Sequence, residues 1–278
     1  MTTAAARKLP SVTLRTRFAL LGFALVAACH SRSTTTPQVG VAVPDDSSSF
    51  YQDLRRGMQH AADSLHLTLH AGAQTSEMDA MVIAPGNAGG RDVTIEGVNG
   101  QVVSDVLSDS RQGGRLLGEY VARRLEGGGN VAILDQPGVA SVRELVAGFR
   151  DALAGYPNIR IVAAPAIDAG GRDVAQQKVG NLLATDQPVN AVFATDDAGL
   201  LGALAAIAAA SRKGIFVVGY DPGPESRAAF NQGAVFGAYA APDPMALGQR
   251  VIEVVAAKLK GEPVPARVLV PVAVVSRP

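Results

Sequence analysis

Acidic side chains follow several short apolar runs of this chain, at the points where strands would end. They are Asp45 and Asp46 after VGVAV, Glu96 after DVTI, Asp135 after NVAIL, Asp196 and Asp197 after NAVFAT, and Asp221 after VVGY. Carboxylates gathered at one edge of a parallel sheet would bind a polyhydroxylated or cationic ligand. Each of them is equally an ordinary helix cap or turn former, so the sequence leaves both interpretations open.

The other reactive residue types form no recognised catalytic or metal-binding pattern. His60, His66 and His70 are spread over an expected helix and strand without further metal ligands, and no Ser-His-Asp or Cys-His grouping is visible. The Gly-rich stretch APGNAGGRD, residues 84–92, lacks the lysine of a phosphate-binding loop, so we interpret it as a loop. We therefore expect neither an enzyme nor a resident cofactor or metal.

Cys29 is the only cysteine, and it lies at the end of an apolar run. A positive leader precedes the uncharged residues 18–28, which are too few to span a bilayer and are typical of a signal peptide. The ending VAAC resembles the bacterial lipobox, which implies that Cys29 is lipidated and becomes the mature N-terminus. The alternatives are a signal cleaved after Ala28, with an incidental thiol, or a buried structural cysteine. Residues 30–38 are polar, as expected of a flexible tether.

Composition narrows the function further. The formal net charge of zero gives no broad attraction to nucleic acid. A single cysteine excludes an internal disulfide, and 278 residues are enough for two lobes with separate cores.

From residue 39 onward, short apolar runs alternate with segments of helical period. Strands are expected at VGVAV, LTL, MVIA, DVTIE, QVVSDVL, NVAILD, IRIVAA, NAVFAT, GIFVVGYD and AVFGAYA. Helices are expected near residues 50–65, 111–126, 141–154, 173–184, 197–211, 225–231 and 244–260, before the extended end ARVLVPVAVV. Continuous apolar strands separated by helices predict a doubly wound α/β fold with parallel sheets covered on both faces.

Several motifs, in order, resemble the ribose-type periplasmic sugar-binding proteins of bacterial ABC importers. They are VGVAVPDDSSSFYQDLRRGMQHAADSL, SDSRQGGRLLGEYVARRL, SVRELVAGFRDAL, NAVFATDDAGLLGAL, VVGYDPGPE and PDPMALGQR. The resemblance implies two Rossmann-like lobes that close on a ligand about a hinge, and a monomer that presents it to a membrane permease. A lipid-anchored sensor or a non-transporting interaction protein of the same fold is the alternative. Sugar-responsive repressors share the fold, but the signal and tether occupy the place of their DNA-binding segment.

The resemblance divides the chain into four parts. They are a signal peptide at 1–28, a lipid-anchored tether at 29–38, a first lobe of 39–108 plus 241–267, and a second lobe of 109–240 plus 268–278. The hinge crossings are expected near residues 108–111, 238–241 and 268–272.

The resemblance also implies a set of ligand contacts. These are Ser48, Phe50, Tyr51, Glu96, Arg143, Asp196, Asp197 and Asp221. Phe50 and Tyr51 match an aromatic pair that packs on a sugar ring, while Arg143 and Asp221 match groups that bind its oxygens and hydroxyls. Ordinary helix packing for the aromatic pair and a solvated Arg143 are the alternatives.

The departures from the family pattern are as informative as the matches. Glu96-Gly97 stands where the family has Asp-Arg, Gly170 where an aromatic is common, and Pro242 where glutamine is usual. The ligand is therefore not assigned as ribose. Residues 69–80 and 85–93 are also too short for crossover helices, so either these strands connect differently or the first lobe is shortened and exposes sheet.

Overall fold

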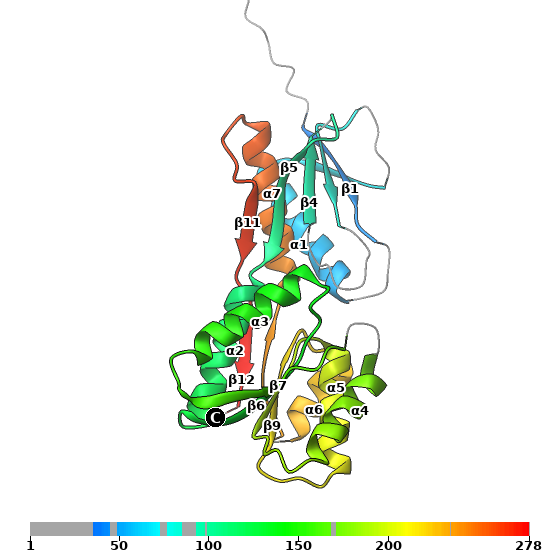
Figure 1. The fold of residues 1–278 in the computed structure, drawn as a ribbon. Helices are drawn as coiled ribbons and strands as arrows, with labels where there is room; N and C mark the ends of the chain where they lie inside the picture. The colour runs from blue at the N-terminus through cyan, green and yellow to red at the C-terminus, as the bar shows by residue number, and fades with distance from the viewer. Residues whose placement is uncertain are drawn as a thin grey trace, which may run out of the picture. The chain divides into compact units, whose positions relative to one another are not determined.

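The chain from residue 36 folds into two sheets, and each belongs to one lobe (Figure 1). The computed structural model describes residues 36–44, 49–72, 77–84, 93–97, 99–167, 171–233 and 235–277. The expected signal peptide, Cys29, most of the tether and Ser48 lie outside these residues.

Within the described residues, the first lobe contains six strands and two helices. They are β1 (Gln38–Ala42), α1 (Ser49–Leu65), β2 (Thr68–Ala71), β3 (Ala80–Ile83), β4 (Val93–Gly97), β5 (Val102–Ser108), α7 (Pro244–Leu259) and β11 (Arg267–Val270). The strand order is β11-β5-β4-β3-β1-β2.

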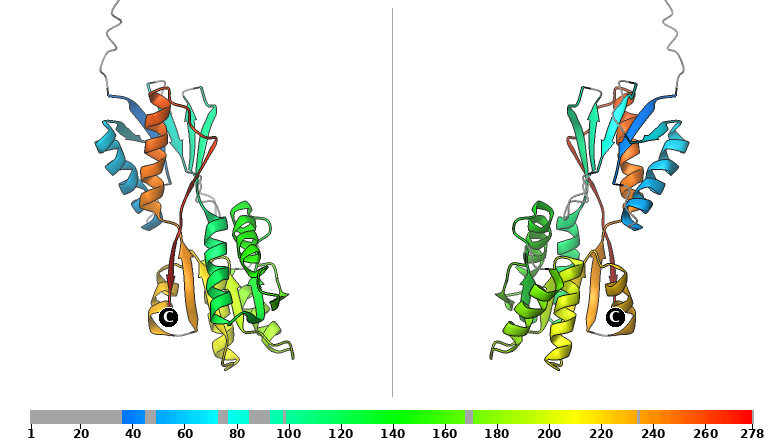
Figure 2. Two further views of the ribbon diagram at one scale, coloured as in Figure 1. Left: turned by 90° about the vertical axis from the view of Figure 1, so that its left-hand side faces the viewer. Right: turned by 90° about the vertical axis from the view of Figure 1, so that its right-hand side faces the viewer.

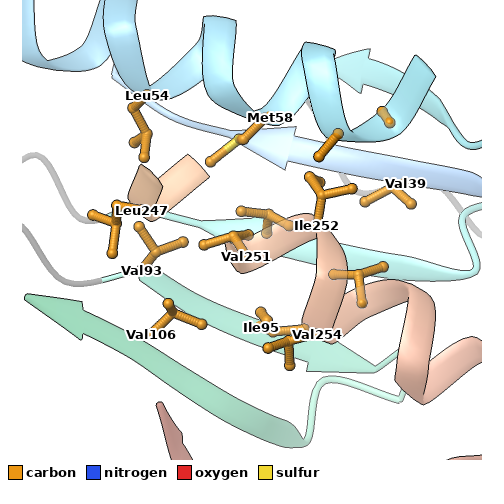
Figure 3. Packing of buried hydrophobic residues seen from close by; sticks show 14 of the residues in the cluster. Val39, Leu54, Met58, Val93, Ile95, Val106, Leu247, Val251, Ile252 and Val254 are labelled. Atoms are coloured by element: carbon orange, nitrogen blue, oxygen red, sulfur yellow. The ribbon is translucent and has the colours of Figure 1, made fainter. Parts of the chain in front are cut away.

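The core of the first lobe lies between the sheet and the paired helices α1 and α7. Figure 3 shows apolar side chains of both helices pointing toward apolar side chains of the strands. The helix residues are Leu54, Met58, Leu247, Val251, Ile252 and Val254, and the strand residues are Val39, Val93, Ile95 and Val106. The helices approach closely at glycines, because a Cβ on Gly57 would lie 2.1 Å from the Met245 carbonyl oxygen. Both helices lie on one face of the sheet (Figure 2).

The expectation of a parallel first sheet is wrong at β4. This strand is antiparallel to both neighbours: its Gly97 lies opposite Ala80 of β3, and its Val93 lies opposite Val106 of β5. An antiparallel neighbour needs no crossover helix, which explains the short connection after β3. Of the two explanations that the sequence left open, different strand connections are therefore confirmed for this segment.

The other face of the first sheet is bare of helices in the part of the chain that the structure describes. Leu107 and Leu269 are paired across β5 and β11, and Leu269 is 51% exposed while its neighbour Val268 is 7% exposed in the core. Val102, at the start of β5, is 60% exposed. One-sided cover thus makes alternate residues of β11 solvent-facing and core-facing.

The second lobe contains the remaining elements. They are α2 (Ser110–Arg124), β6 (Gly128–Leu134), α3 (Ala140–Leu153), β7 (Asn158–Ala163), α4 (Gly171–Leu183), β8 (Ala191–Ala194), α5 (Asp197–Ala209), β9 (Phe216–Tyr220), α6 (Pro224–Gln232), β10 (Phe236–Ala241) and β12 (Ala273–Ser276). The strand order is β12-β10-β9-β8-β6-β7, and only β12 is antiparallel to its neighbour.

The second sheet is covered on both faces, as the continuous apolar strands predict. In β8, Ala191 and Phe193 contact the core under α2 and α3, whereas Val192 and Ala194 contact the core under α4 and α5. All four residues are fully buried, which is why this strand shows no alternation of polar residues.

The part of the chain that the structure describes crosses between the sheets three times. The crossings fall at Asp109, at residues 242–243 and at residues 271–272, so the second lies slightly later than expected and β11 stays in the first sheet up to Val270. The Asp109 amide donates to the Val270 carbonyl (2.8 Å), and the Val272 amide donates to Oε1 of Gln112 (3.1 Å). These bonds tie the first crossing to the third.

Candidate functional site

The carboxyl ends of β6, β8 and β9 meet at one edge of the second sheet. These strands are adjacent and parallel, with Leu134 in register with Ala194, and Ala194 with Gly219. The acidic residues that follow them, Asp135, Asp196 and Asp221, are therefore brought to the same edge. In doubly wound sheets this edge is where ligands bind.

Asp196 is held by two hydrogen bonds. Its Oδ1 accepts from the Gly199 amide (2.7 Å), which makes Asp196 the N-cap of α5, and its Oδ2 accepts from Nε2 of Gln136 (2.6 Å). The cap satisfies one of the amides at the start of the helix. Gln136 was not predicted, and its bond connects the loop after β6 to the start of α5.

Asp197 connects two loops at the same edge. Its Oδ1 accepts from the Gly223 amide (2.7 Å) and from the hydroxyl of Ser226, which is fully buried. These bonds fasten the start of α5 to the start of α6. Because both donors come from the segment after β9, Asp197 makes a long-range tie and not a local cap or turn, and its predicted ligand contact stays a prediction.

Asp221 has an unusual backbone conformation. Its φ is 53°, in the left-handed region, and its amide donates to the Ala240 carbonyl (2.7 Å). Asp tolerates this conformation better than most residues. The position directly after β9 and the constrained backbone fix where this side chain starts, at the edge shared with Asp135 and Asp196.

Phe50 and Tyr51 lie in the first turn of α1, next to the carboxyl end of β1. Their rings contact edge to face, with centroids 5.3 Å apart. Phe50 is 7% exposed in the core, whereas Tyr51 is partly buried against that core. Arg55, one turn later, donates to the carbonyls of Val43 and Pro44 and so fastens the end of β1 to this helix.

Glu96 is not brought to this type of edge. Because β4 runs antiparallel, Glu96 lies opposite Met81 near the start of β3, at the edge away from the carboxyl ends of β1 and β3. The sequence assignment of Glu96 assumed a parallel strand, and the reversal of β4 removes its reason.

Arg143 lies on the exposed face of α3, and its Nη1 donates to the Pro137 carbonyl (2.9 Å). It lines a groove of about 730 Å³ together with residues of β5, α2 and β11. None of the carboxylates at the ends of β6, β8 and β9 lines that groove. The structure therefore places Arg143 and Asp221 in different surroundings.

The groove beside Arg143 is lined by paired charges. Arg111 donates to Glu144 (3.2 Å) and Asp151 (2.5 Å), both on α3. The hydrogen bond that Arg111 donates to Glu144, with the nearby charge of Asp151, raises the pKa of the Arg111 guanidinium above its ordinary value. These exposed pairs join α2 to α3 and leave the groove with cations and anions side by side.

The described residues offer no cluster of three or more metal-ligating side chains. His60 and His70 make isolated hydrogen bonds with Gln249 and Gln38, respectively. Within the described ranges, no helix is long and apolar enough to cross a bilayer.

Comparison with known proteins agrees with this arrangement. The model of the periplasmic binding protein domain matches residues 91–263. The chain belongs to that family. The ribose import binding protein RbsB of Escherichia coli is 34% identical to this family member over 176 residues, which cover 62% of the chain and 57% of RbsB. The chain thus matches somewhat more than half the length of that relative.

Solved structures show the same fold across most of this periplasmic binding protein. A solute-binding protein of an ABC transporter from Actinobacillus succinogenes, with bound D-allose, superimposes with a TM-score of 0.67 at 22% identity, covering 86% of this chain and 97% of the other. The arabinose-binding protein AraP of Geobacillus stearothermophilus gives a TM-score of 0.73 at 16% identity, covering 87% and 97%. At these identities the likeness shows the fold.

Proposed function

We propose that this protein is an extracytoplasmic solute-binding protein that captures a sugar or related polyol between its two lobes and delivers it to an ABC import permease. The observation that carries the proposal is the edge where β6, β8 and β9 end, because it gathers Asp135, Asp196 and Asp221 in a periplasmic binding protein fold. Carboxylates accept the hydroxyl donors of such a ligand. The names of the relatives support the same ligand class.

The aromatic pair at the start of α1 supplies the first lobe's contribution. Tyr51, only partly buried, offers ring surface on which the apolar face of a sugar packs, and Phe50 supports it from the core. The protein binds without chemistry on the ligand, and it works as a monomer. We assign Asp221 to the ligand hydroxyls. The ligand contact predicted for Arg143 stays a prediction, because Arg143 lines a different groove.

A thermal-shift screen of the mature protein against pentoses, hexoses and polyols tests the proposal. A ligand present at a hundredfold excess over its Kd stabilises the folded state by about 2.7 kcal/mol. We expect a shift with at least one neutral sugar, and we expect Asp221→Ala to abolish it. A cooperative melt with no shift for any sugar would refute sugar capture and favour the alternative, a lipid-anchored sensor or interaction protein.

The proposal includes a lipid anchor at Cys29, supported by the lipobox-like VAAC. Acyl chains contribute about 0.8 kcal/mol per buried CH₂, so multiple chains hold a protein on a membrane. We expect the parent chain in the membrane fraction of a bacterial host and Cys29→Ser in the aqueous fraction. Equal membrane recovery of the variant would contradict the anchor while leaving sugar binding intact.

A further inference from the structure

The first and third crossings between the lobes run side by side. β5 and β11 are parallel neighbours up to the pair Ser108 and Val270, and the Asp109 amide continues this pairing by donating to the Val270 carbonyl (2.8 Å). At Ser110 the chain enters α2, so pairing of the strand type ends there. Beyond this point the third crossing needs a different partner.

Gln112 supplies that partner from α2. Pro271 has no amide hydrogen, so the Val272 amide is the one backbone donor that residues 271–272 can offer. Val272 is only 8% exposed, and its amide donates to Oε1 of Gln112 (3.1 Å). A side-chain oxygen of a helix thus takes the place that a strand carbonyl holds in the first lobe, and it satisfies a donor that is costly to bury alone.

The start of α2 is held in place for this contact. Asp109 caps the helix, because its Oδ1 accepts from the Gln112 amide (2.8 Å), so both the backbone and the side chain of Gln112 are engaged at the crossings. The helix also lies close to the third crossing, since a Cβ on Gly113 would lie 3.0 Å from Cγ2 of Val272. Gln112 is therefore the point at which the two crossings are joined on the side of the second lobe.

The same part of α2 contacts the strand-end edge of the second sheet. Tyr220 is the last residue of β9 and directly precedes Asp221, which the proposed function assigns to the ligand. A Cβ on Gly113 would lie 3.0 Å from Cε2 of the Tyr220 ring, and the Tyr220 hydroxyl is 3.5 Å from Oγ of Ser110. A rotation of α2 at the crossings therefore acts on the residue next to the assigned ligand contact.

We propose that Gln112 is a positioning residue for ligand capture, whose bond to Val272 makes the first and third crossings turn as one unit when the lobes close. The inference rests on the proposed function and adds a residue that acts on closure without touching the ligand. Without the bond, the unliganded crossings sample additional conformations, which the ligand must remove when it binds. Every ligand then loses affinity by the same factor, because the contacts inside the site are unchanged.

Gln112→Leu and Gln112→Glu, in the full mature protein, test the proposal. Leucine removes the acceptor at similar size, whereas glutamate keeps an acceptor oxygen and is favourable in the first turn of a helix. Calorimetric titration with D-ribose, D-allose and xylitol measures affinity, and amide hydrogen exchange at Val272 reports on the bond itself. We expect Gln112→Leu to bind each sugar that binds the parent roughly 3- to 10-fold more weakly, the range that one hydrogen bond accounts for, with faster exchange at Val272. Gln112→Glu should restore both.

Two controls separate positioning from a structural role. Gln177→Leu, at an exposed glutamine of α4, is the matched substitution and should change neither affinity nor exchange at Val272. The melting temperature without ligand is measured for each variant. A residue that is only structural would lower the melting temperature in Gln112→Leu and leave the affinity of the folded protein unchanged.

Three results would overturn the inference. They are unchanged affinity in Gln112→Leu, losses of affinity that differ from one sugar to another, which would mean that Gln112 touches the ligand, and a loss that Gln112→Glu does not restore. If the parent protein binds none of the probes, the proposed function itself fails and this inference with it. A parent that binds sugar, beside a Gln112→Leu variant that binds it equally well, contradicts this inference alone.

Discussion

Packing of α2 on α3 depends on a glycine that tolerates no side chain. A Cβ on Gly114 would lie 1.8 Å from the Leu145 carbonyl oxygen, about 1.6 Å short of ordinary van der Waals contact, which begins at 3.4 Å. The reciprocal contact is as close, because a Cβ on Gly148 would lie 2.0 Å from the Arg111 carbonyl oxygen. Both clashing atoms belong to backbone, so no rotamer change relieves them, and Gly114→Ala must push the helices apart.

The loss of stability in Gly114→Ala depends on which buried contacts are broken when α2 and α3 move apart. Leu117 and Phe149 lie fully buried at the helix contact, and Phe149 stacks on Phe193 of β8 at 4.2 Å. Overpacking of this kind costs about 1–3 kcal/mol or more, while alanine gains roughly 1 kcal/mol over glycine in a helix. A backbone clash belongs at the upper end of the range, so we expect a net loss of about 2 kcal/mol. The melting temperature should fall by about 4–8 °C.

Gly180 in α4 provides the matched control. A Cβ there would meet nothing within 4 Å, so Gly180→Ala should gain about 0.5–1 kcal/mol and raise the melting temperature by roughly 1–4 °C. Thermal unfolding followed by circular dichroism measures both variants against the parent. The reasoning is refuted if Gly114→Ala melts at or above the parent temperature, or if the two substitutions change it in the same direction.

Two further sets of substitutions test the structure, one at the start of α5 and one in β11. Asp197→Ala should lose about 2–3 kcal/mol of unfolding free energy, because it leaves the buried Ser226 hydroxyl and the Gly223 amide without their acceptor. Asp186→Ala, at an exposed aspartate, is the control. A loss no larger than the control's would mean that Asp197 does not tie α5 to α6. In β11, Val268→Ser should lose about 2 kcal/mol and Leu269→Ser less than about 0.5 kcal/mol, because only Val268 faces the core. Chemical denaturation checks this pair, and equal losses would mean that the outer face of the first sheet is covered.

The second lobe is predictable from sequence because its inner strands β8, β9 and β10 are buried on both faces. The run NAVFAT predicts a strand that the structure places at Ala191–Ala194, and the expected helix 197–211 corresponds to Asp197–Ala209. Apolar runs, helical period and an N-capping aspartate agree here. The extended end ARVLVPVAVV is divided differently, since Pro271 separates β11 of one sheet from β12 of the other.

The direction of the strands in the first lobe cannot be predicted from the local sequence pattern. The alternation in DVTIE fits a parallel and an antiparallel neighbour equally well. Only the length of the connection bears on direction, and it left two explanations open. Pairing with β3 and β5, the strands directly before and after it in the chain, fixes the direction of β4. The helix-free outer face of the first sheet shows that the second explanation, exposed sheet, also holds in the described residues.

The candidate site also has residues that could be predicted from the sequence and residues that could not. Asp196 and Asp221 are predicted at the strand-end edge and lie there. Gln136 carries no periodic signal in the loop DQPG, so only the three-dimensional contact with Asp196 reveals it. Arg143 shares α3 with buried Leu145 and Val146, and this helical spacing turns it away toward the groove.

The reversal of β4 has a consequence for where binding free energy originates. With Glu96 at the far edge, the proposed site takes Tyr51, supported by Phe50, from the described residues of the first lobe and the strand-end carboxylates from the second lobe. Hydrogen bonds to charged groups contribute more than neutral ones, so polar recognition should belong mainly to the second lobe. Packing of the Tyr51 ring on the sugar would then favour closure of the lobes, because the sugar must contact the first lobe while the second lobe binds its hydroxyls. On this argument, Tyr51→Ala should weaken the binding of many sugars to a similar extent, whereas Asp221→Ala should abolish the thermal shift for all of them.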